Sequence, residues 1–402
     1  MKPMVQYLTI FMEMHQPRRI REGVFERLLY STEIRDADES MLMDLLFDKD
    51  LDKRILNRIS DKCYLPVLNT IMEEELKISL SVSGILLEFL RETRSDVLEV
   101  LQQASSIQLI EFLCEPYHHS LAIFAGEDVF RQEMKDSLKI IREFFGKKPK
   151  IAFNTEGLYA DSLADLLEEM GFTATITEGV EGILGWRSPT FLYTAHNSNL
   201  KILLRHCQLS DDIGFRFGDR SWSQFPLTAD KYASWIRNLP GEFVVIGFDI
   251  ETFGEHFKQE TGILEFLRWL PRELKKRGVK LLHPSEILEY FEPADEIFFE
   301  RVVSWADKEK DESAWLGNEM QKLAFNSLLK SRKIFEKKKC SKLWRMFLTS
   351  DHFYYMSTKT GPAGMVHGYF NPYKSPYKAF KCFIEALTGS LTALHYSRYT
   401  ST

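Results

Sequence analysis

The sequence predicts an α/β fold in which strand–helix repeats form a barrel and a purely helical region follows. Eight short apolar or β-rich runs recur between residues 6 and 283, and helical patterns separate most of them. This alternation is typical of a parallel sheet built from βα units. From about residue 293 onward, amphipathic helical segments follow one another without strands between them. We therefore expect a barrel over residues 1–292 and a helical domain over residues 293–402.

The strands are expected, in chain order, at residues 6–14, 76–84, 107–113, 150–154, 173–177, 201–206, 243–248 and 279–283. The long charged segment 18–75, which follows the first strand, is expected to form a helical insertion. A helix is also expected after the fourth strand, because one helix face would gather Leu163, Leu166, Leu167 and Met170. Asp161 is placed to cap the start of this helix and Gly171 to end it.

Composition argues against several classes of protein. A net charge of −6 with a pI near 6.0 disfavours nucleic acid as a partner, since a phosphate backbone requires a basic surface stripe. The one basic stretch, residues 330–340, fits a solvated helix face. Five scattered cysteines without a C-x-x-C pair indicate reduced thiols and a cytoplasmic protein. No run approaches 18 apolar residues and no signal-peptide pattern opens the chain, so no membrane association is expected.

Polar residues suited to catalysis follow several of the expected strands. In a βα barrel, active sites lie at the carboxyl ends of the strands. The residues at these ends are His15, Gln16 and Pro17 after the first strand, Glu115, His118 and His119 after the third, Glu156 after the fourth, and Asp249, Glu251, Glu255 and His256 after the seventh. Each has a plain explanation as a loop residue, but their recurrence at one end of a barrel indicates a site.

The stretch FDIETFGEH, residues 248–256, allows two interpretations. It fits a helix start, with Asp249 as the N-cap and acidic residues in the first turn. It also fits a strand that delivers a carboxylate to the rim of an active site. Two carboxylates on opposite sides of a pocket are what glycosidic cleavage requires, because one protonates the leaving oxygen and the other meets the charge at the anomeric carbon. Glu156 and Asp249 are the natural pair.

Several stretches occur in the order seen in glycoside hydrolase family 57 and resemble its α-amylase branch. They are MHQP, CEPYHHSLA, FNTEGLYADSLADLLEEMGF, GWRSP, LSDDIGFRFGDRSW and FDIETFGEH, and the similarity continues into SAWLGNEMQKLAF and the C-terminal helical region. The resemblance implies a retaining α-glucan-active enzyme on an incomplete seven-stranded (β/α) barrel, with a helical region that completes the cleft. Seven strands are one fewer than the eight runs, and 173–177 is the weakest candidate among them.

The resemblance also implies roles for individual residues. The nucleophile corresponds to Glu156 and the general acid/base to Asp249, while His15 corresponds to the pocket floor and His119 to a position near the sugar ring. In this mechanism Glu156 attacks the anomeric carbon as Asp249 protonates the departing oxygen, and water or a second sugar then resolves the glycosyl-enzyme. A neighbouring carboxylate charge and the apolar strand before Asp249 would both favour its protonated form.

Flat aromatic and planar polar side chains are expected to bind the sugar. Trp186 with Arg187, Trp222 and the tyrosine-rich segment 352–356 fit this role. The predicted substrate-binding set is completed by His15, Gln16, His119, Glu251, His256, Asp351 and His352. Two alternatives stay open: Glu251 also fits a first-turn acid of a helix, and the pair Asp211 and Asp212 fits either substrate binding or a turn.

Three functions compete on this evidence. The leading one is an α-1,4-glucan hydrolase, and a 4-α-glucanotransferase differs from it only in whether water or a sugar accepts the glycosyl unit. A metal-dependent polysaccharide deacetylase would use His15, Asp249 and His256 as ligands, but no H-x-x-x-H or H-x-H spacing supports it. A non-catalytic carbohydrate-binding relative is disfavoured because Glu156 and Asp249 are both present. We therefore expect an α-glucan substrate, no cofactor and no metal.

Overall fold

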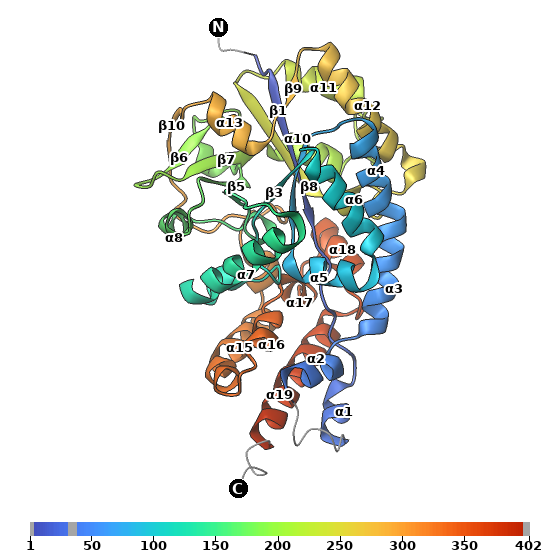
Figure 1. The fold of residues 1–402 in the computed structure, drawn as a ribbon, viewed down its shortest axis with the longest axis vertical. Helices are drawn as coiled ribbons and strands as arrows, with labels where there is room; N and C mark the ends of the chain where they lie inside the picture. Colours follow the sequence, from blue (N-terminus) through green and yellow to red (C-terminus); the bar gives the residue numbers. More distant parts are fainter. Residues whose placement is uncertain (1–3, 31–37, 397–402) are drawn as a thin grey trace. The chain divides into compact units, whose positions relative to one another are not determined.

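The computed structural model describes residues 4–30 and 38–396 and confirms the α/β fold, with a nearly closed seven-stranded parallel barrel followed by C-terminal helices (Figure 1). Residues 31–37 of the predicted insertion lie outside the described residues. By contacts the chain forms two compact units. The barrel unit contains residues 1–15, 56–117 and 131–305, and the helical unit contains residues 16–55, 118–130 and 306–402. The boundary expected at residue 293 stays a prediction.

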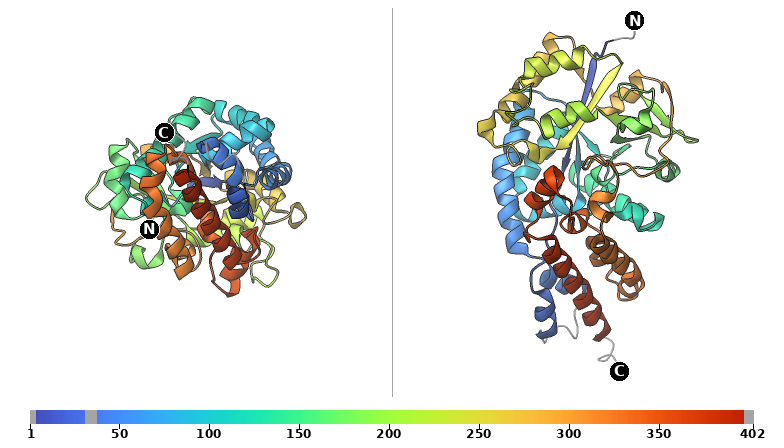
Figure 2. Two further views of the ribbon diagram at one scale, coloured as in Figure 1. Left: turned by 90° about the horizontal axis from the view of Figure 1, so that it is seen from below. Right: turned by 180° about the vertical axis from the view of Figure 1, so that it is seen from behind.

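Seven strands form the wall of the barrel. They are β1 (Tyr7–Met14), β2 (Ile78–Val82), β3 (Ile110–Leu113), β4 (Ile151–Ala152), β5 (Ala174–Glu178), β7 (Lys201–Arg205) and β8 (Phe243–Asp249). Each pairs in parallel with the next in this order, and β8 returns to β1 over seven residue pairs. Figures 1 and 2 draw the strands as arrows. The β3–β4 step is a single bridge between Cys114 and Ala152. All the strands of this wall therefore point their carboxyl ends to the same side.

Two expectations about the strands are wrong. The run 173–177, expected to be the weakest, is the fully buried strand β5, which pairs with β7 over five residues. The run 279–283 yields only β9 (Lys280–Leu281), which pairs with Tyr7 and Leu8 of β1 and lies off the barrel wall. The reason is that β2 already pairs with Phe11–Met14, so only the start of that edge of β1 is open to β9. Two three-residue strands, β6 (Tyr193–Ala195) and β10 (Asp295–Ile297), were not expected.

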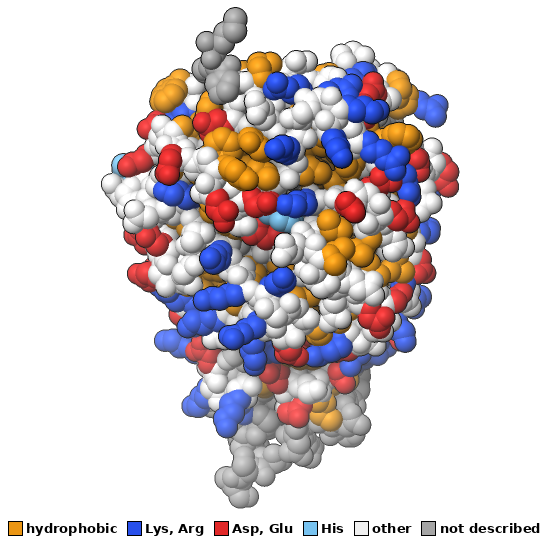
Figure 3. Space-filling model, turned by 45° about the horizontal axis from the view of Figure 1, so that its top comes forward, with side chains coloured by type: hydrophobic (Ala, Val, Ile, Leu, Met, Phe, Trp, Pro, Cys, Tyr) orange, Lys and Arg blue, Asp and Glu red, His pale blue; other side chains and the backbone are white. Residues whose placement is uncertain are grey.

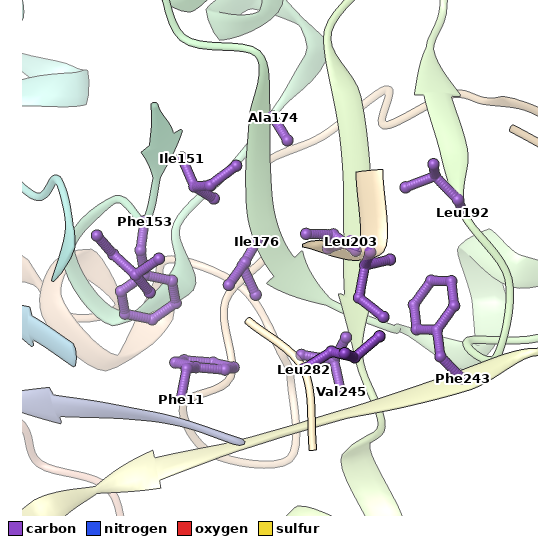
Figure 4. Packing of buried hydrophobic residues seen from close by; sticks show 12 residues of the cluster. Phe11, Ile151, Phe153, Ala174, Ile176, Leu192, Leu203, Phe243, Val245 and Leu282 are labelled. Carbon is purple, nitrogen blue, oxygen red and sulfur yellow. The ribbon is translucent and has the colours of Figure 1, made fainter. Parts of the chain in front are cut away.

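A cluster of apolar side chains, most of them from these strands, packs inside the barrel (Figure 4). Phe11 of β1 is completely buried, and its ring lies 4.9 Å from that of Phe153. A Cβ atom added to Gly247 on the neighbouring strand would come within 2.0 Å of the Phe11 ring, so only glycine fits there. Loss of a ring such as Phe11 from this core would cost about 3–5 kcal/mol of stability.

The helices of the barrel unit are α4 (Leu65–Glu73), α5 (Gly84–Thr93), α6 (Ser95–Ser106), α8 (Ala164–Glu169), α9 (Glu181–Leu184), α10 (Cys207–Gly214), α11 (Ala229–Arg237), α12 (Ile263–Lys276) and α13 (Pro284–Tyr290). Helix α8 matches the helix predicted after the fourth strand, and Gly171 follows it with a φ of +86°. Asp161 does not cap this helix. Its carboxylate instead accepts a hydrogen bond from the Phe299 backbone N–H at 3.1 Å.

The helical unit confirms the helices expected near the C-terminus. It contains α1 (Val24–Tyr30), α2 (Glu39–Leu46), α14 (Ser313–Leu316), α15 (Glu319–Lys337), α16 (Ser341–Met346), α17 (Ser350–Tyr354), α18 (Gly361–Phe370) and α19 (Pro376–Tyr396). Helices α3 (Lys49–Ile59) and α7 (Glu127–Phe145) contribute residues to both units. Across residues 4–30 and 38–396, no helix is long and apolar enough to cross a membrane.

Candidate active site

Glu156 lies in a tight loop after β4 and has an unusual backbone conformation. Its φ of +56° and ψ of 24° lie in the left-handed region, which residues other than glycine rarely adopt. The Glu156 carbonyl accepts hydrogen bonds from Ser304 Oγ at 2.8 Å and from the Trp305 backbone N–H at 3.3 Å. Its own N–H donates to Glu13 Oε1 at 3.3 Å. Backbone strain of this kind persists where surrounding contacts impose it, and it is frequent at functional sites.

The Glu156 side chain is oriented by Trp305. The indole Nε1–H donates to Oε2 of Glu156 at 2.5 Å. The Trp305 ring stacks on Phe11 with the centroids 5.9 Å apart, and it leans on Phe153 at 5.3 Å. The predicted nucleophile is therefore held by a ring that packs against the barrel core.

Glu13 connects the two predicted catalytic residues. It is buried near the carboxyl end of β1, and its register partner on β8 is Asp249. Since neighbouring strands lie about 4.8 Å apart, the backbones of Glu13 and Asp249 are adjacent. The Glu13 carboxylate also accepts the Glu156 N–H across the barrel mouth. The structure thus brings Glu156 and Asp249 to the same end of the barrel, with a third carboxylate between their loops.

His15 lies at the same end of the barrel, one residue after β1. Its Nδ1 atom is 2.7 Å from the Ser83 hydroxyl, which follows β2. Ser83 is buried and His15 is half-buried. This contact holds the imidazole between the ends of two adjacent strands, and the position of His15 at the floor of a site stays a prediction.

The segment after Asp249 is not the start of a regular helix. Strand β8 ends at Asp249 in a single 3₁₀ turn, Ile250–Thr252, and the Asp249 side chain makes no capping hydrogen bond to it. The next α-helix, α12, begins only at Ile263. The helix-cap interpretation of this stretch is therefore wrong, whereas a strand that ends in a carboxylate describes it.

Three more polar side chains follow Asp249. Glu251 lies in the first turn of this 3₁₀ segment, is buried, and accepts a hydrogen bond from the Tyr64 hydroxyl at 2.5 Å. Glu255 pairs with Arg58 at 2.5 Å. Burial lowers the pKa of His256 to about 4, so its ring is neutral at pH 7 and able to accept as well as donate a hydrogen bond.

Gln16 belongs to the helical unit and is held by a buried ion pair. Its side-chain oxygen accepts a hydrogen bond from Arg19 Nη2 at 2.9 Å. Arg19 Nη1 pairs with Asp52 Oδ1 at 3.1 Å, and both side chains are almost fully buried. Burial raises the pKa of Asp52 to about 6. The Gln16 amide is therefore positioned by charged groups of its own unit.

His119, Asp351 and His352 also belong to the helical unit. The His119 carbonyl accepts the Ser350 N–H at 3.0 Å, which brings the loop of His119 beside the start of α17. His119 is buried and has a left-handed φ of +50°. Asp351 accepts a hydrogen bond from the Tyr355 hydroxyl at 3.2 Å. His352 is buried between aromatic rings, and burial lowers its pKa to about 4.

Trp186 and Arg187 lie in the barrel unit after α9. Trp186 is 79% exposed, and the Arg187 guanidinium lies 4.9 Å from the centroid of its ring. Arg187 also pairs with Asp295 at 2.8 Å. A hollow of about 480 Å³ is lined by Ile183, Arg187, His196, Asp295, Glu296, Ile297 and Phe298. Glu156 and Asp249 are not among these lining residues, so the structure does not place Arg187 with the carboxylates.

The remaining predicted binding residues contact protein side chains. Trp222 is half-buried and packs edge-on against Trp235 with centroids 6.1 Å apart. Asp211 pairs with Arg205 at 2.7 Å, and Asp212 pairs with Arg216 at 3.2 Å. The two aspartates therefore have structural partners. On the face drawn in Figure 3, both acidic and basic side chains are exposed.

Sequence reasoning missed Glu13 and Trp305. A charged residue inside the otherwise apolar strand β1 is a signal that could have indicated Glu13. Trp305 had no such signal, because it lies 149 residues from Glu156 in an irregular segment.

Comparison with known proteins gives a consistent result. Residues 9–300 match the family described as glycosyl hydrolase family 57. A Methanocaldococcus jannaschii protein described as "Putative alpha-amylase" is 38% identical over 399 residues, covering 94% of this chain and 83% of that protein. The fold is similar to that of a branching enzyme from Thermococcus kodakaraensis (TM-score 0.66, 14% identity, 91% of this chain and 87% of that one). It is also similar to a 4-alpha-glucanotransferase from Thermococcus litoralis (TM-score 0.58, 16% identity, 88% of this chain), of which the chain spans about half, 51%.

Proposed function

Since the chain belongs to glycosyl hydrolase family 57 and is a glycoside hydrolase of that family, we propose that it cleaves α-1,4-glucosidic bonds in starch, glycogen or maltodextrins. The observation that carries the proposal is the Glu156 loop, in which a strained glutamate is held by Glu13 and Trp305 at the end of the barrel where Asp249 also lies. The relative from Methanocaldococcus jannaschii supports an α-amylase activity.

In the proposed reaction Glu156 is the nucleophile and Asp249 the general acid/base. A Glu156 oxygen forms a bond to the anomeric carbon while the glycosidic C–O bond breaks, and the departing oxygen takes its electron pair and the proton of Asp249. Asp249 then removes a proton from water, whose oxygen bonds to the anomeric carbon as the ester bond to Glu156 breaks. Each enzyme carboxyl returns to its starting state, and the anomeric configuration is retained.

The other predicted residues have binding roles in this proposal. His15, Gln16, His119, Glu251, His256, Asp351 and His352 supply hydrogen bonds to sugar hydroxyls or hold groups that do, and Trp186, Arg187 and Trp222 supply flat surfaces. The substrate is an α-glucan. The five cysteines, all free, support a reducing compartment such as the cytoplasm.

A 4-α-glucanotransferase is the second candidate, favoured by the fold similarity to the enzyme from Thermococcus litoralis. Both reactions share the glycosyl-enzyme and differ in the acceptor. Incubation with maltoheptaose, with and without added glucose, separates them. A hydrolase gives shorter maltooligosaccharides in both cases, whereas a transferase also gives longer products and responds to the added acceptor.

The test of the proposed function is substitution of Glu156. Glu156→Gln should retain the fold and glucan binding but lose several orders of magnitude in turnover, because an amide cannot form the glycosyl-enzyme. In Glu156→Ala, azide should enter the vacated space and give a β-glycosyl azide, the inverted product. A Gln variant that keeps more than about a tenth of the wild-type rate, under ~1.4 kcal/mol of barrier, would remove the nucleophile assignment.

A further inference from the structure

A buried cluster of charged side chains lies against the ring of Trp305 in the barrel unit. Its centre is Arg205, the last residue of β7, which is 3% exposed. Arg205 Nη1 pairs with Glu178 at 2.6 Å, Nη2 pairs with Asp211 at 2.7 Å, and Nε donates to the Gly247 carbonyl at 2.8 Å. These three directed bonds come from three different segments of the barrel, so they fix the plane of the guanidinium.

The guanidinium contacts the ring that orients the predicted nucleophile. The central carbon of Arg205 lies 5.4 Å from the centroid of the Trp305 ring. The same ring stacks on Phe11 and donates its N–H to Oε2 of Glu156. A continuous series of contacts therefore runs from Glu178 and Asp211 through Arg205 and Trp305 to Glu156.

A cation over the face of an indole makes its N–H edge more positive. Cation–π attraction draws ring electrons toward the charge, and a more positive N–H is a stronger donor to a carboxylate. Burial enhances both interactions, because the effective dielectric is lower than in water. Arg205 thus has an electrostatic effect at Glu156 without touching it.

Stability alone does not account for this cluster. Replacing a buried ion pair with well-packed apolar residues is often neutral or stabilising, because the charges lose their hydration on folding. The hydrophobic core cluster of the barrel is formed by apolar side chains and includes none of Arg205, Glu178 and Asp211. The position of the Arg205 guanidinium against the Trp305 ring suggests instead that the charged cluster acts on the group that Trp305 holds, the Glu156 carboxylate.

We propose that Arg205 is a positioning residue for the glycosyl-transfer reaction, acting through the Trp305 ring to hold the Glu156 carboxylate in place for attack. This inference rests on the proposed function of Glu156. The acids Glu178 and Asp211 in turn hold Arg205, and Trp305 is the contact through which the cluster acts.

The test uses two substitutions and their combination. Trp305→Phe keeps an aromatic ring against Phe11 and Arg205 but removes the N–H, and Arg205→Lys keeps the charge but cannot make three directed bonds. Each should lower kcat for maltoheptaose hydrolysis about 10- to 100-fold, the worth of one hydrogen bond to a charged group. The KM should stay within about threefold, since the ring orients the nucleophile and not the substrate.

The double variant distinguishes positioning from a structural role. If Arg205 acts through the indole N–H, Arg205→Lys in the Trp305→Phe background causes no further loss in kcat. Losses that multiply, or a loss confined to thermal stability with an unchanged kcat, would overturn the inference. If Arg205→Lys does not fold, an unchanged kcat in Trp305→Phe alone has the same meaning.

Arg332 offers a matched control in the helical unit. It also lies over a tryptophan, Trp344, at 5.6 Å and pairs with two acids, Asp128 and Glu336. Arg332→Lys should leave kcat unchanged, and a loss equal to that of Arg205→Lys would count against a specific role. Glu156→Gln is assayed alongside. If Glu156→Gln stays active, the proposed function and this inference fall together. If Glu156→Gln is inactive while Trp305→Phe keeps the wild-type kcat, only this inference falls.

Discussion

Two arginine–tryptophan pairs in the barrel unit have similar contact distances and different surroundings. Arg187 lies 4.9 Å from the ring of Trp186 and pairs with Asp295, and Trp186 is largely exposed. Arg205 lies 5.4 Å from the ring of Trp305 and pairs with two acids, and it is almost fully buried. Water screens the first pair and not the second. The same contact is therefore a surface feature in one place and a determinant of the site in the other.

Removal of the two arginines should show this contrast in stability. Arg205→Leu leaves Glu178, which is 1% exposed, as an uncompensated buried charge, and it should cost about 3–5 kcal/mol. Arg187→Leu breaks a pair whose side chains are 24% and 37% exposed, and it should cost less than about 1 kcal/mol. Urea unfolding of both variants checks this. Equal losses would show that burial does not separate the pairs.

The buried His352 gives burial a second measurable effect, a dependence of the unfolding free energy on pH. Burial lowers the pKa of His352 to about 4, below the value near 6.5 of the unfolded chain. As the pH falls, the unfolded state takes up the proton first, so the stability contributed by the neutral ring is complete above pH 6.5 and is lost toward pH 4. His352→Phe keeps an aromatic ring between Phe47 and Phe383 and removes the titration.

Between pH 7 and pH 4.5, the wild-type protein should therefore lose about 2 kcal/mol more unfolding free energy than His352→Phe. If His352→Phe follows the wild-type curve at every pH, the ring is not buried in its neutral form.

The buried and exposed regions also differ in how well the sequence predicts them. Apolar runs identified the barrel strands because a parallel strand is buried on both faces, as β8 is over Phe243–Phe248. Whether the run at 279–283 forms a barrel strand depends on which part of the β1 edge is free to pair, and no local sequence pattern shows this. Pairing across the barrel decided it.

The same limit applies to the site. Glu156 and Asp249 could be predicted as a pair, because Asp249 ends β8, Glu156 lies in the loop after β4, and the carboxyl ends of both strands share one side of the barrel. Trp305 could not, since its contact with Glu156 depends on the path of the irregular segment after β10. Trp186 was expected to bind the sugar because it is a flat aromatic residue, and residue type does not determine where on the barrel a side chain lies.

The smallest expected effect is that of Trp186→Ala, and it depends on the length of the glucan. The exposed Trp186 ring lies beside a hollow whose lining residues do not include Glu156 or Asp249. A short substrate bound at the two carboxylates is therefore not expected to contact Trp186. A long chain extends beyond that site and can stack a sugar on the open face of the indole. One such stacking contact is worth about 1 kcal/mol, so Trp186→Ala should raise the KM for glycogen about fivefold and leave kcat/KM for maltotriose unchanged.

Trp269→Ala is a suitable control, because Trp269 is also exposed (46%) and its ring lies near the guanidinium of Arg272 on α12. Parallel kinetics on both substrates decide the matter: an equal loss on maltotriose and glycogen would place Trp186 within the catalytic site, and no loss on either would leave it without a role in glucan binding.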